Sequence, residues 1–171
     1  MSISYEAVCA FLYREARHLD ERDWDSWLAC YDEKASFWMP AWDDDGELTE
    51  DPQSEISLIY YANRGGLEDR VFRIRTERSS ATIPDTRTSH NITNVELVAQ
   101  NGNEVKVRFN WHTCSTRYNH TDLFYGNSEY TIDFSGANPL IKDKKVVLKT
   151  DYIRHVVDVY VRRGLARALE M

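Results

Sequence analysis

The chain has 171 residues, of which 42% are hydrophobic and 29% are charged, a balance typical of a soluble globular protein. A chain of this length buries a core without disulfide or metal staples, and we expect one domain over residues 1–171. The net charge of −7 excludes the basic surface that nucleic-acid binding requires, so no nucleic-acid partner is expected.

Two helices and a short strand are predicted at the start of the chain. Residues 4–20 carry apolar side chains at steps of three and four, which places them on one face of a helix, and Ser4 is a suitable N-cap. Residues 24–31 predict a second helix with an aromatic stripe. The apolar residues 35–39 then favour a strand that stops at Pro40.

An acidic segment over residues 41–53 is predicted to be a long surface loop. The aspartates at 43–45 are open to two interpretations, a cation site or a solvated turn, and the turn is the commoner structure. Residues 54–61 are apolar and indicate a strand or a buried turn. After a pair of glycines, residues 67–76 favour a helix.

The second half of the sequence has the pattern of β-strands. Residues 88–98 predict a long strand, and Asn101-Gly102 is a typical hairpin turn. Residues 105–113 alternate apolar and polar side chains, the clearest period of two in the chain. Further strands are expected at 123–134 and 145–153, and the tail from 154 is ambiguous between strand and helix.

The order of the elements, helices first and strands later, indicates the α+β class. Strands of this length curl strongly. We therefore expect N-terminal helices packed on a strongly curved, mostly antiparallel sheet that forms a cone around the first helix.

Metal ligation is the first chemistry that the five histidines suggest. A non-haem iron needs two histidines and a carboxylate on one face. His18 and Asp20 are two residues apart on a helix, so they point in different directions. His120 and Asp122 would share a face of a strand, with His112 as a third ligand. Their surroundings are polar and turn-like, however, and we predict a surface loop without a metal.

The cysteines suggest no cofactor either. Cys9, Cys30 and Cys114 lack a following histidine at the spacing of a Rieske iron–sulfur centre, so we interpret them as small buried residues. An odd number of cysteines without an export signal predicts reduced thiols in the cytoplasm. No apolar run is long enough to span a membrane. Nucleophile-elbow, phosphate-binding and dinucleotide-binding motifs are absent from the sequence.

An arginine-rich segment and abundant tryptophans suggest contact surfaces. Four arginines crowd into residues 70–78, where they either pair with nearby acidic residues or dock onto another chain. Five tryptophans are too many for the core alone, so some could line a pocket or anchor an interface, while most should be ordinary core or half-buried residues. The candidate interface residues are Arg70, Arg73, Arg75, Arg78, Trp38 and Trp42.

Several stretches resemble the small (beta) subunits of ring-hydroxylating Rieske dioxygenases. The beginning of those subunits is similar to FLYREARHLDERDWDSWLACY (11–31) and FWMPAWDDD (37–45). The benzoate and toluate branch resembles SEISLIYYANRGGLEDRVFRIRTERSSATIPDTRTSHNITNVEL (54–97), and RFNWHT (108–113) and DYIRHVVDVY (151–160) are similar too. Residues 161–171 depart from the family pattern, as a C-terminal extension would.

The resemblance implies a cystatin-like cone, shared with nuclear-transport-factor-like proteins, in a chain without catalytic residues, metal or cofactor of its own. Three such subunits would form a ring that supports three large (alpha) subunits. The large subunits would carry the Rieske 2Fe-2S cluster and the mononuclear iron, and electrons would come from NADH through a separate reductase. The complex would convert an arene carboxylate (benzoate, toluate, anthranilate or a halobenzoate) and dioxygen into a cis-diol.

Two other functions stay open on the residues alone. A stand-alone isomerase or dehydratase of the same fold would use a histidine or carboxylate with a shifted pKa, and the candidates are His90, His112 and Asp133. Because Asp133 and Phe134 are neighbours on a predicted strand, their side chains lie on opposite faces. We therefore expect the Asp133 side chain to face solvent. A small-molecule binding module would use the inside of the cone as its pocket.

Overall fold

The computed structural model describes residues 2–76 and 86–150 of the chain. Three helices lie in this part: α1 (Tyr5–Glu21), α2 (Trp24–Leu28) and α3 (Gly65–Arg75). The predicted N-cap of α1 is confirmed, because the Ser4 hydroxyl accepts a hydrogen bond from the backbone N–H of Ala7 at 3.2 Å. The periodic apolar face of α1 is buried, and its core residues include Val8, Phe11, Leu12 and Leu19.

Six strands form one sheet in the order β2-β1-β6-β5-β4-β3. The strands are β1 (Tyr31–Pro40), β2 (Ser57–Tyr61), β3 (Arg87–Asn101), β4 (Glu104–Arg117), β5 (His120–Asp133) and β6 (Leu140–Leu148). Four of the five neighbouring pairs are antiparallel, whereas β1 and β6 run parallel. β1 has β2 on one side and β6, the last strand of the described chain, on the other. β1 therefore lies inside the sheet rather than at an edge.

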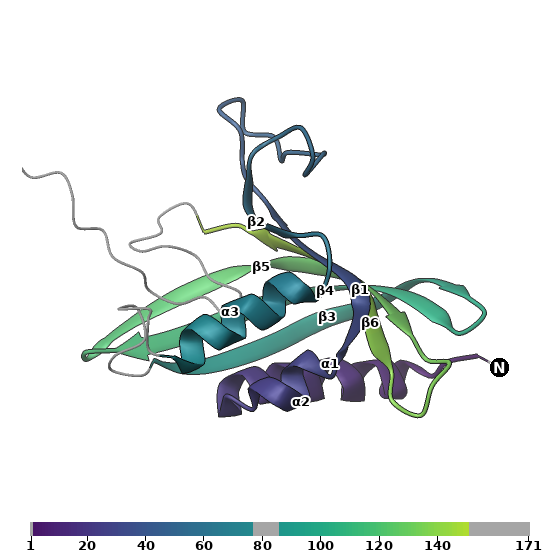
Figure 1. Ribbon diagram of the computed structural model, residues 1–171. Helices are drawn as coiled ribbons and strands as arrows, with labels where there is room; N and C mark the ends of the chain where they lie inside the picture. The colour runs from purple at the N-terminus through teal and green to yellow at the C-terminus, as the bar shows by residue number, and fades with distance from the viewer. Residues whose placement is uncertain (1, 77–85, 151–171) are drawn as a thin grey trace, which may run out of the picture.

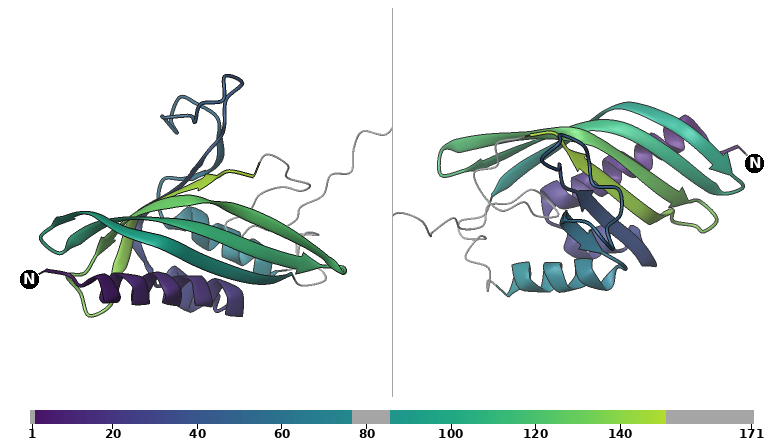
Figure 2. Two further views of the ribbon diagram at one scale, coloured as in Figure 1. Left: turned by 180° about the vertical axis from the view of Figure 1, so that it is seen from behind. Right: turned by 90° about the horizontal axis from the view of Figure 1, so that it is seen from above.

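The helices gather on one side of the sheet. Figures 1 and 2 show α1 and α2 below the sheet, α3 beside it, and the segment between β1 and β2 rising away from the opposite side. α1 packs against β3, α2 contacts both other helices, and α3 contacts β2. The core lies between α1 and the inward faces of the central strands, where Phe37, Val107 and Ile132 are buried.

The α+β class and the mostly antiparallel sheet are confirmed, but two boundaries near the start were predicted wrongly. α2 ends at Leu28, and Tyr31 already begins β1 because its side chain is drawn into the core. Pro40 belongs to the strand that it was expected to stop. It pairs with Ser57 at a shift in register, where the ladder is interrupted and a proline is tolerated. β1 and β2 also precede α3, so the strands do not all follow the helices.

The second half agrees better with the sequence. The Asn101-Gly102 hairpin turn is confirmed, and Gly102 takes the positive φ of 59° that glycine adopts readily. β5 begins at His120 instead of 123, because Tyr118 and Asn119, both with positive φ, reverse the chain in a two-residue turn. β6 occupies 140–148 rather than 145–153. The tail from 151, including 161–171, lies outside the described residues.

Candidate functional site

A buried ion pair joins α1 to the centre of the sheet. Nζ of Lys144 donates a hydrogen bond to Oε1 of Glu15 at 2.8 Å, and the two side chains are only 5% and 3% exposed. The same Oε1 accepts hydrogen bonds from Nε1 of Trp27 at 2.7 Å and from the hydroxyl of Tyr31 at 2.8 Å. Lys144 also lies 4.7 Å from the centre of the Tyr130 ring. Every charge in this cluster is therefore paired or hydrogen-bonded.

The environment fixes the protonation of this cluster. Burial by itself would raise the pKa of Glu15, but the Lys144 ammonium and the three hydrogen bonds outweigh burial and hold the pKa below its usual value. Burial, and then the negative charge of Glu15, raise the pKa of the Tyr31 phenol well above its usual value. Glu15 is thus an anion and Tyr31 a neutral donor across the physiological pH range.

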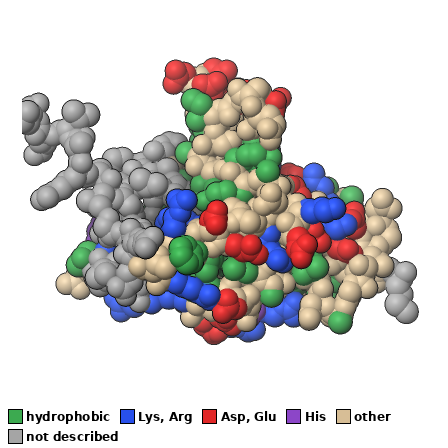
Figure 3. All heavy atoms as spheres, in the orientation of Figure 1, with side chains coloured by type: hydrophobic (Ala, Val, Ile, Leu, Met, Phe, Trp, Pro, Cys, Tyr) green, Lys and Arg blue, Asp and Glu red, His purple; other side chains and the backbone are tan. Residues whose placement is uncertain are grey.

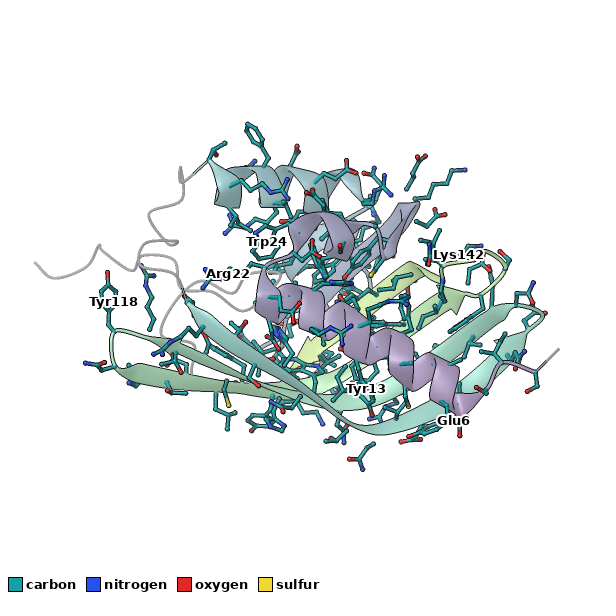
Figure 4. All side chains as sticks on the ribbon, turned by 90° about the horizontal axis from the view of Figure 1, so that it is seen from below. Glu6, Tyr13, Arg22, Trp24, Tyr118 and Lys142 are labelled. Atoms are coloured by element: carbon teal, nitrogen blue, oxygen red, sulfur yellow. The ribbon has the colours of Figure 1, made fainter. Side chains whose placement is uncertain are left out.

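A second polar contact ties the end of α1 to β3. Oδ1 of Asp20 lies 2.6 Å from Nδ1 of His90, and Oδ2 accepts a hydrogen bond from the His90 backbone N–H at 3.0 Å. The Thr88 hydroxyl donates to Oδ1 at 2.9 Å. Burial would raise the pKa of Asp20, but its hydrogen bonds to His90 outweigh burial and lower it. Figure 4 shows α1 lying across the sheet, with Arg22 just beyond its end nearer the Tyr118 turn and Glu6 at the opposite end.

These two contacts border one pocket between α1 and the sheet. Its polar walls include Glu15, His90, Trp111 and Lys144, and the rest of the lining is largely apolar. Nε1 of Trp111 is buried without a hydrogen-bond partner in the described part of the chain. The expectation that a tryptophan lines a pocket is therefore confirmed for Trp111. Trp24 and Trp27, by contrast, belong to the core.

The histidine–carboxylate pairs do not assemble a metal site among the described residues. As predicted, His18 and Asp20 diverge, since Nδ1 of His18 lies 3.6 Å from Oδ2 of Asp23 while Asp20 turns to β3. Nε2 of His120 lies 2.9 Å from Oδ1 of Asp122, and His112 is exposed on β4. The described residues therefore do not fit a mononuclear iron site.

The cysteines do not fit an iron–sulfur cluster either. Cys9 and Cys30 are buried, Cys114 is half-buried, and all three are free thiols. Burial, reinforced by the charge of Glu15, raises the pKa of Cys30 to about 11, which keeps it protonated and unsuited to binding a metal.

The three candidate residues of a stand-alone enzyme do not come together. His90 lines the pocket, whereas His112 lies on the exposed face of β4. Asp133 lies at the end of β5, where Oδ1 accepts a hydrogen bond from the backbone N–H of Ser135 and Oδ2 lies 3.8 Å from Nζ of Lys142. A shared catalytic centre of these three residues is not formed.

The arginine segment is divided between internal pairing and exposure. Nη2 of Arg75 lies 2.8 Å from Oδ1 of Asp25 on α2, so this arginine links two helices. Arg73 is exposed on α3, while Arg70 is half-buried and takes part in interactions of its own. Arg78 lies outside the described residues. Internal pairing is thus present at Arg75, while docking of the segment onto another chain stays a prediction.

The two candidate interface tryptophans lie in β1 and just after it. Trp38 donates from Nε1 to the Ser57 hydroxyl at 2.9 Å, and Nζ of Lys145 lies 4.5 Å from the centre of its ring. Trp42 is 44% exposed and donates from Nε1 to the backbone oxygen of Leu148 at 2.7 Å. Trp42 begins the raised segment whose tip carries acidic side chains in Figure 3. There the aspartates at 43–45 form an exposed turn.

Comparison with known proteins gives the class. A family model described as ring hydroxylating beta subunit matches residues 14–155, so the chain belongs to that family. It is 66% identical over 160 residues to the toluate 1,2-dioxygenase subunit beta of Pseudomonas putida, covering 94% of this chain and 99% of the relative. The benzoate 1,2-dioxygenase subunit beta of Acinetobacter baylyi is 60% identical, with 93% of this chain and 94% of the relative covered. The chain lies in the benzoate and toluate branch of the family.

Solved structures agree with this placement. The crystal structure of the beta subunit of the benzoate 1,2-dioxygenase from Burkholderia mallei superposes with a TM-score of 0.82 at 56% identity, covering 94% of this chain and 99% of that one. A naphthalene 1,2-dioxygenase chain shares the fold at 18% identity, with a TM-score of 0.71. Within the described residues, no helix is long and apolar enough to cross a membrane.

Proposed function

We propose that this chain is the structural small subunit of an oxygenase that converts a benzoate-type aromatic acid and dioxygen into a cis-diol. One observation carries the proposal: the near-complete, high-identity alignment with the beta subunits of toluate and benzoate 1,2-dioxygenases. The substrate class comes from the names of those relatives. The ring is recognised in the large (alpha) subunit, so benzoate, toluate, anthranilate and halobenzoates all belong to the proposed class.

The iron centres belong to the partner in this proposal. The described residues bring no group of three metal-binding side chains together, and the buried thiol of Cys30 is a poor ligand. The large subunit then holds the Rieske cluster and the mononuclear iron, and a separate reductase delivers electrons from NADH. Because NADH is supplied inside the cell, the assembly is cytoplasmic.

The role of this chain is to supply shape and contact surface. The sheet and α1 form a cone, three cones form a ring, and each supports one large subunit in a three-plus-three hexamer. A cyclic ring needs two different patches on each subunit. The arginines of α3 supply one patch, because Arg73 is exposed and Arg75 takes part in an exposed ion pair with Asp25. Trp38 and Trp42 mark the other.

Co-expression with the large subunit tests the proposal. We expect the two chains to co-purify in equal amounts, with iron and acid-labile sulfide following the large chain. When NADH and the reductase supply electrons, cis-diol should form from benzoate only with the complex. The 171-residue chain purified alone should contain no stoichiometric iron. Turnover of an aromatic acid by the isolated chain, or iron held at full occupancy by its own histidines, would contradict the proposal.

A further inference from the structure

The pocket between α1 and the sheet contains a buried donor that the described part of the chain leaves without a partner. The Nε1 atom of Trp111 is buried and donates to nothing in the described part of the chain. An unsatisfied buried donor is destabilising, so such a group normally has a partner, which can be a bound water or a ligand.

Two further polar side chains line the same space. Within the described residues, the three hydrogen bonds to the Glu15 carboxylate all end on Oε1, so Oε2 remains as an acceptor on a residue that lines the pocket. His90 points Nδ1 at Asp20, so its Nε2 lies on the opposite side of the ring. His90 and Trp111 are diagonal neighbours on the core-facing side of β3 and β4, since His90 pairs with Thr113 and Ile92 pairs with Trp111.

The remaining lining indicates the shape of a ligand. Phe37, Phe109 and Tyr130 surround the pocket with aromatic rings, and aliphatic side chains fill the gaps between them. Aromatic walls favour a flat ring that stacks or packs edge to face. Apolar walls with a few placed polar atoms are typical of small-molecule sites.

The charges decide against an anion. Lys144 is already paired with Glu15 and hydrogen-bonded to Tyr31, so its charge is committed within the protein. Asp20 adds a negative charge beside His90. A carboxylate entering the pocket would lose its hydration, would meet no unpaired cation, and would lie close to Oε2 of Glu15.

We propose that this pocket binds a small, uncharged aromatic molecule that carries one hydrogen-bond acceptor and one donor. The acceptor receives the Trp111 N–H, and the donor reaches Nε2 of His90, the diagonal neighbour of Trp111. A carboxamide or a ring hydroxyl fits this description, whereas a benzoate anion does not.

Titration of the full-length chain with benzamide tests the proposal. In nitrogen-15-labelled protein, each tryptophan indole gives a separate N–H signal, and Trp111→Phe identifies the signal of Trp111. We expect benzamide to shift that signal saturably, and benzoate to bind about tenfold or more weakly. A Trp111 signal that stays fixed up to the solubility limit of benzamide, as it would if a trapped water satisfied the indole, would overturn the proposal. Equal affinity for benzoate would overturn the uncharged ligand class.

Matched variants locate the binding. Trp111→Phe keeps an aromatic ring but removes the donor, and calorimetry should show about five- to tenfold weaker benzamide binding. Trp42→Phe, at an exposed tryptophan outside the pocket, should bind as the wild type does. If Trp111→Phe fails to fold, His90→Asn replaces it, because asparagine can keep the contact with Asp20 while Nε2 is lost. Undiminished binding in the folded pocket variant would refute the site.

Discussion

At the scale of single residues, the Glu15–Lys144 pair is the feature most sensitive to substitution. Oε1 of Glu15 collects donors from α2, β1 and β6, so one oxygen connects helices to the sheet. A buried pair of this kind contributes little net stability compared with apolar residues of the same shape. Removing one partner, however, leaves an uncompensated charge in the core.

Lys144→Met should therefore lower the free energy of unfolding by about 3–5 kcal/mol, the usual cost of breaking a buried pair. The matched control is Lys145→Met, one residue along β6, where the ammonium lies over the face of Trp38 at the surface. It should cost no more than about 1 kcal/mol. Urea denaturation followed by circular dichroism measures both changes. If both variants lose the same free energy of unfolding, the cost does not come from breaking the buried pair.

Asp20 gives a prediction about pH. Its pKa is lower in the folded chain than in the unfolded chain, so its contribution is present in full above the unfolded pKa of about 4 and is lost as the pH falls through the folded pKa. Asp20→Asn keeps the shape but not the charge. We expect the variant to be less stable than the wild type at pH 7 and the difference to narrow below about pH 4. A difference that stays constant between pH 7 and pH 3 would rule out this linkage.

At the scale of elements, Gly126 shows how closely β5 approaches β6. A Cβ atom at this position would overlap the backbone oxygen of Val147 and would lie 3.0 Å from the Trp111 ring. Gly126→Ala should therefore destabilise the chain by about 1–3 kcal/mol. Gly136→Ala is the control, because its Cβ atom meets nothing closer than 3.5 Å. Thermal unfolding of both variants checks this, and an unchanged melting temperature for Gly126→Ala would disprove the close approach.

The periodic spacing of apolar side chains along the sequence predicted the helices and strands that are formed by neighbouring residues. The steps of three and four in α1 and the alternation in β4 identified both elements and their buried faces. The Glu15–Lys144 contact was missed because it joins residues 129 positions apart, and no periodicity connects them. The sequence did indicate one partner of this contact, because Glu15 falls on the apolar face of α1. A charged residue on such a face predicts a buried partner without naming it.

Tyr31 and Pro40 show why the ends of β1 were misjudged. Sequence preference assigned Tyr31 to the aromatic stripe of a helix, but the carboxylate of Glu15 holds it in the core, a tertiary contact that overrides local propensity. Pro40 was expected to end the strand, but it lies at a shift in register with β2. Both errors come from partners that are distant in the sequence.

At the scale of the whole molecule, the exposed arginine of α3 tests the proposed assembly. Arg73→Glu should leave the isolated chain as stable as the wild type, because an exposed side chain contributes little to folding. The hexamer that contains this variant should dissociate at protein concentrations at which the wild-type hexamer stays intact. Arg17→Glu places the same charge change on the exposed side of α1 as a control. Light scattering coupled to size exclusion gives the mass of each assembly. A hexamer of unchanged mass and unchanged dilution behaviour in Arg73→Glu would remove α3 from the proposed interface.

The parallel pairing of β1 with β6 also sets the order in which the chain can fold. The hairpins of β3, β4 and β5 connect neighbours in sequence and can form while the ribosome is still adding residues. β1 leaves the ribosome early but has only the short β2 beside it until β6 is made. The lysine that neutralises Glu15 arrives on that same late strand. Until then the Glu15 carboxylate has the Trp27 and Tyr31 donors but not the lysine that neutralises it, so we expect the core to close only after β6 has been made.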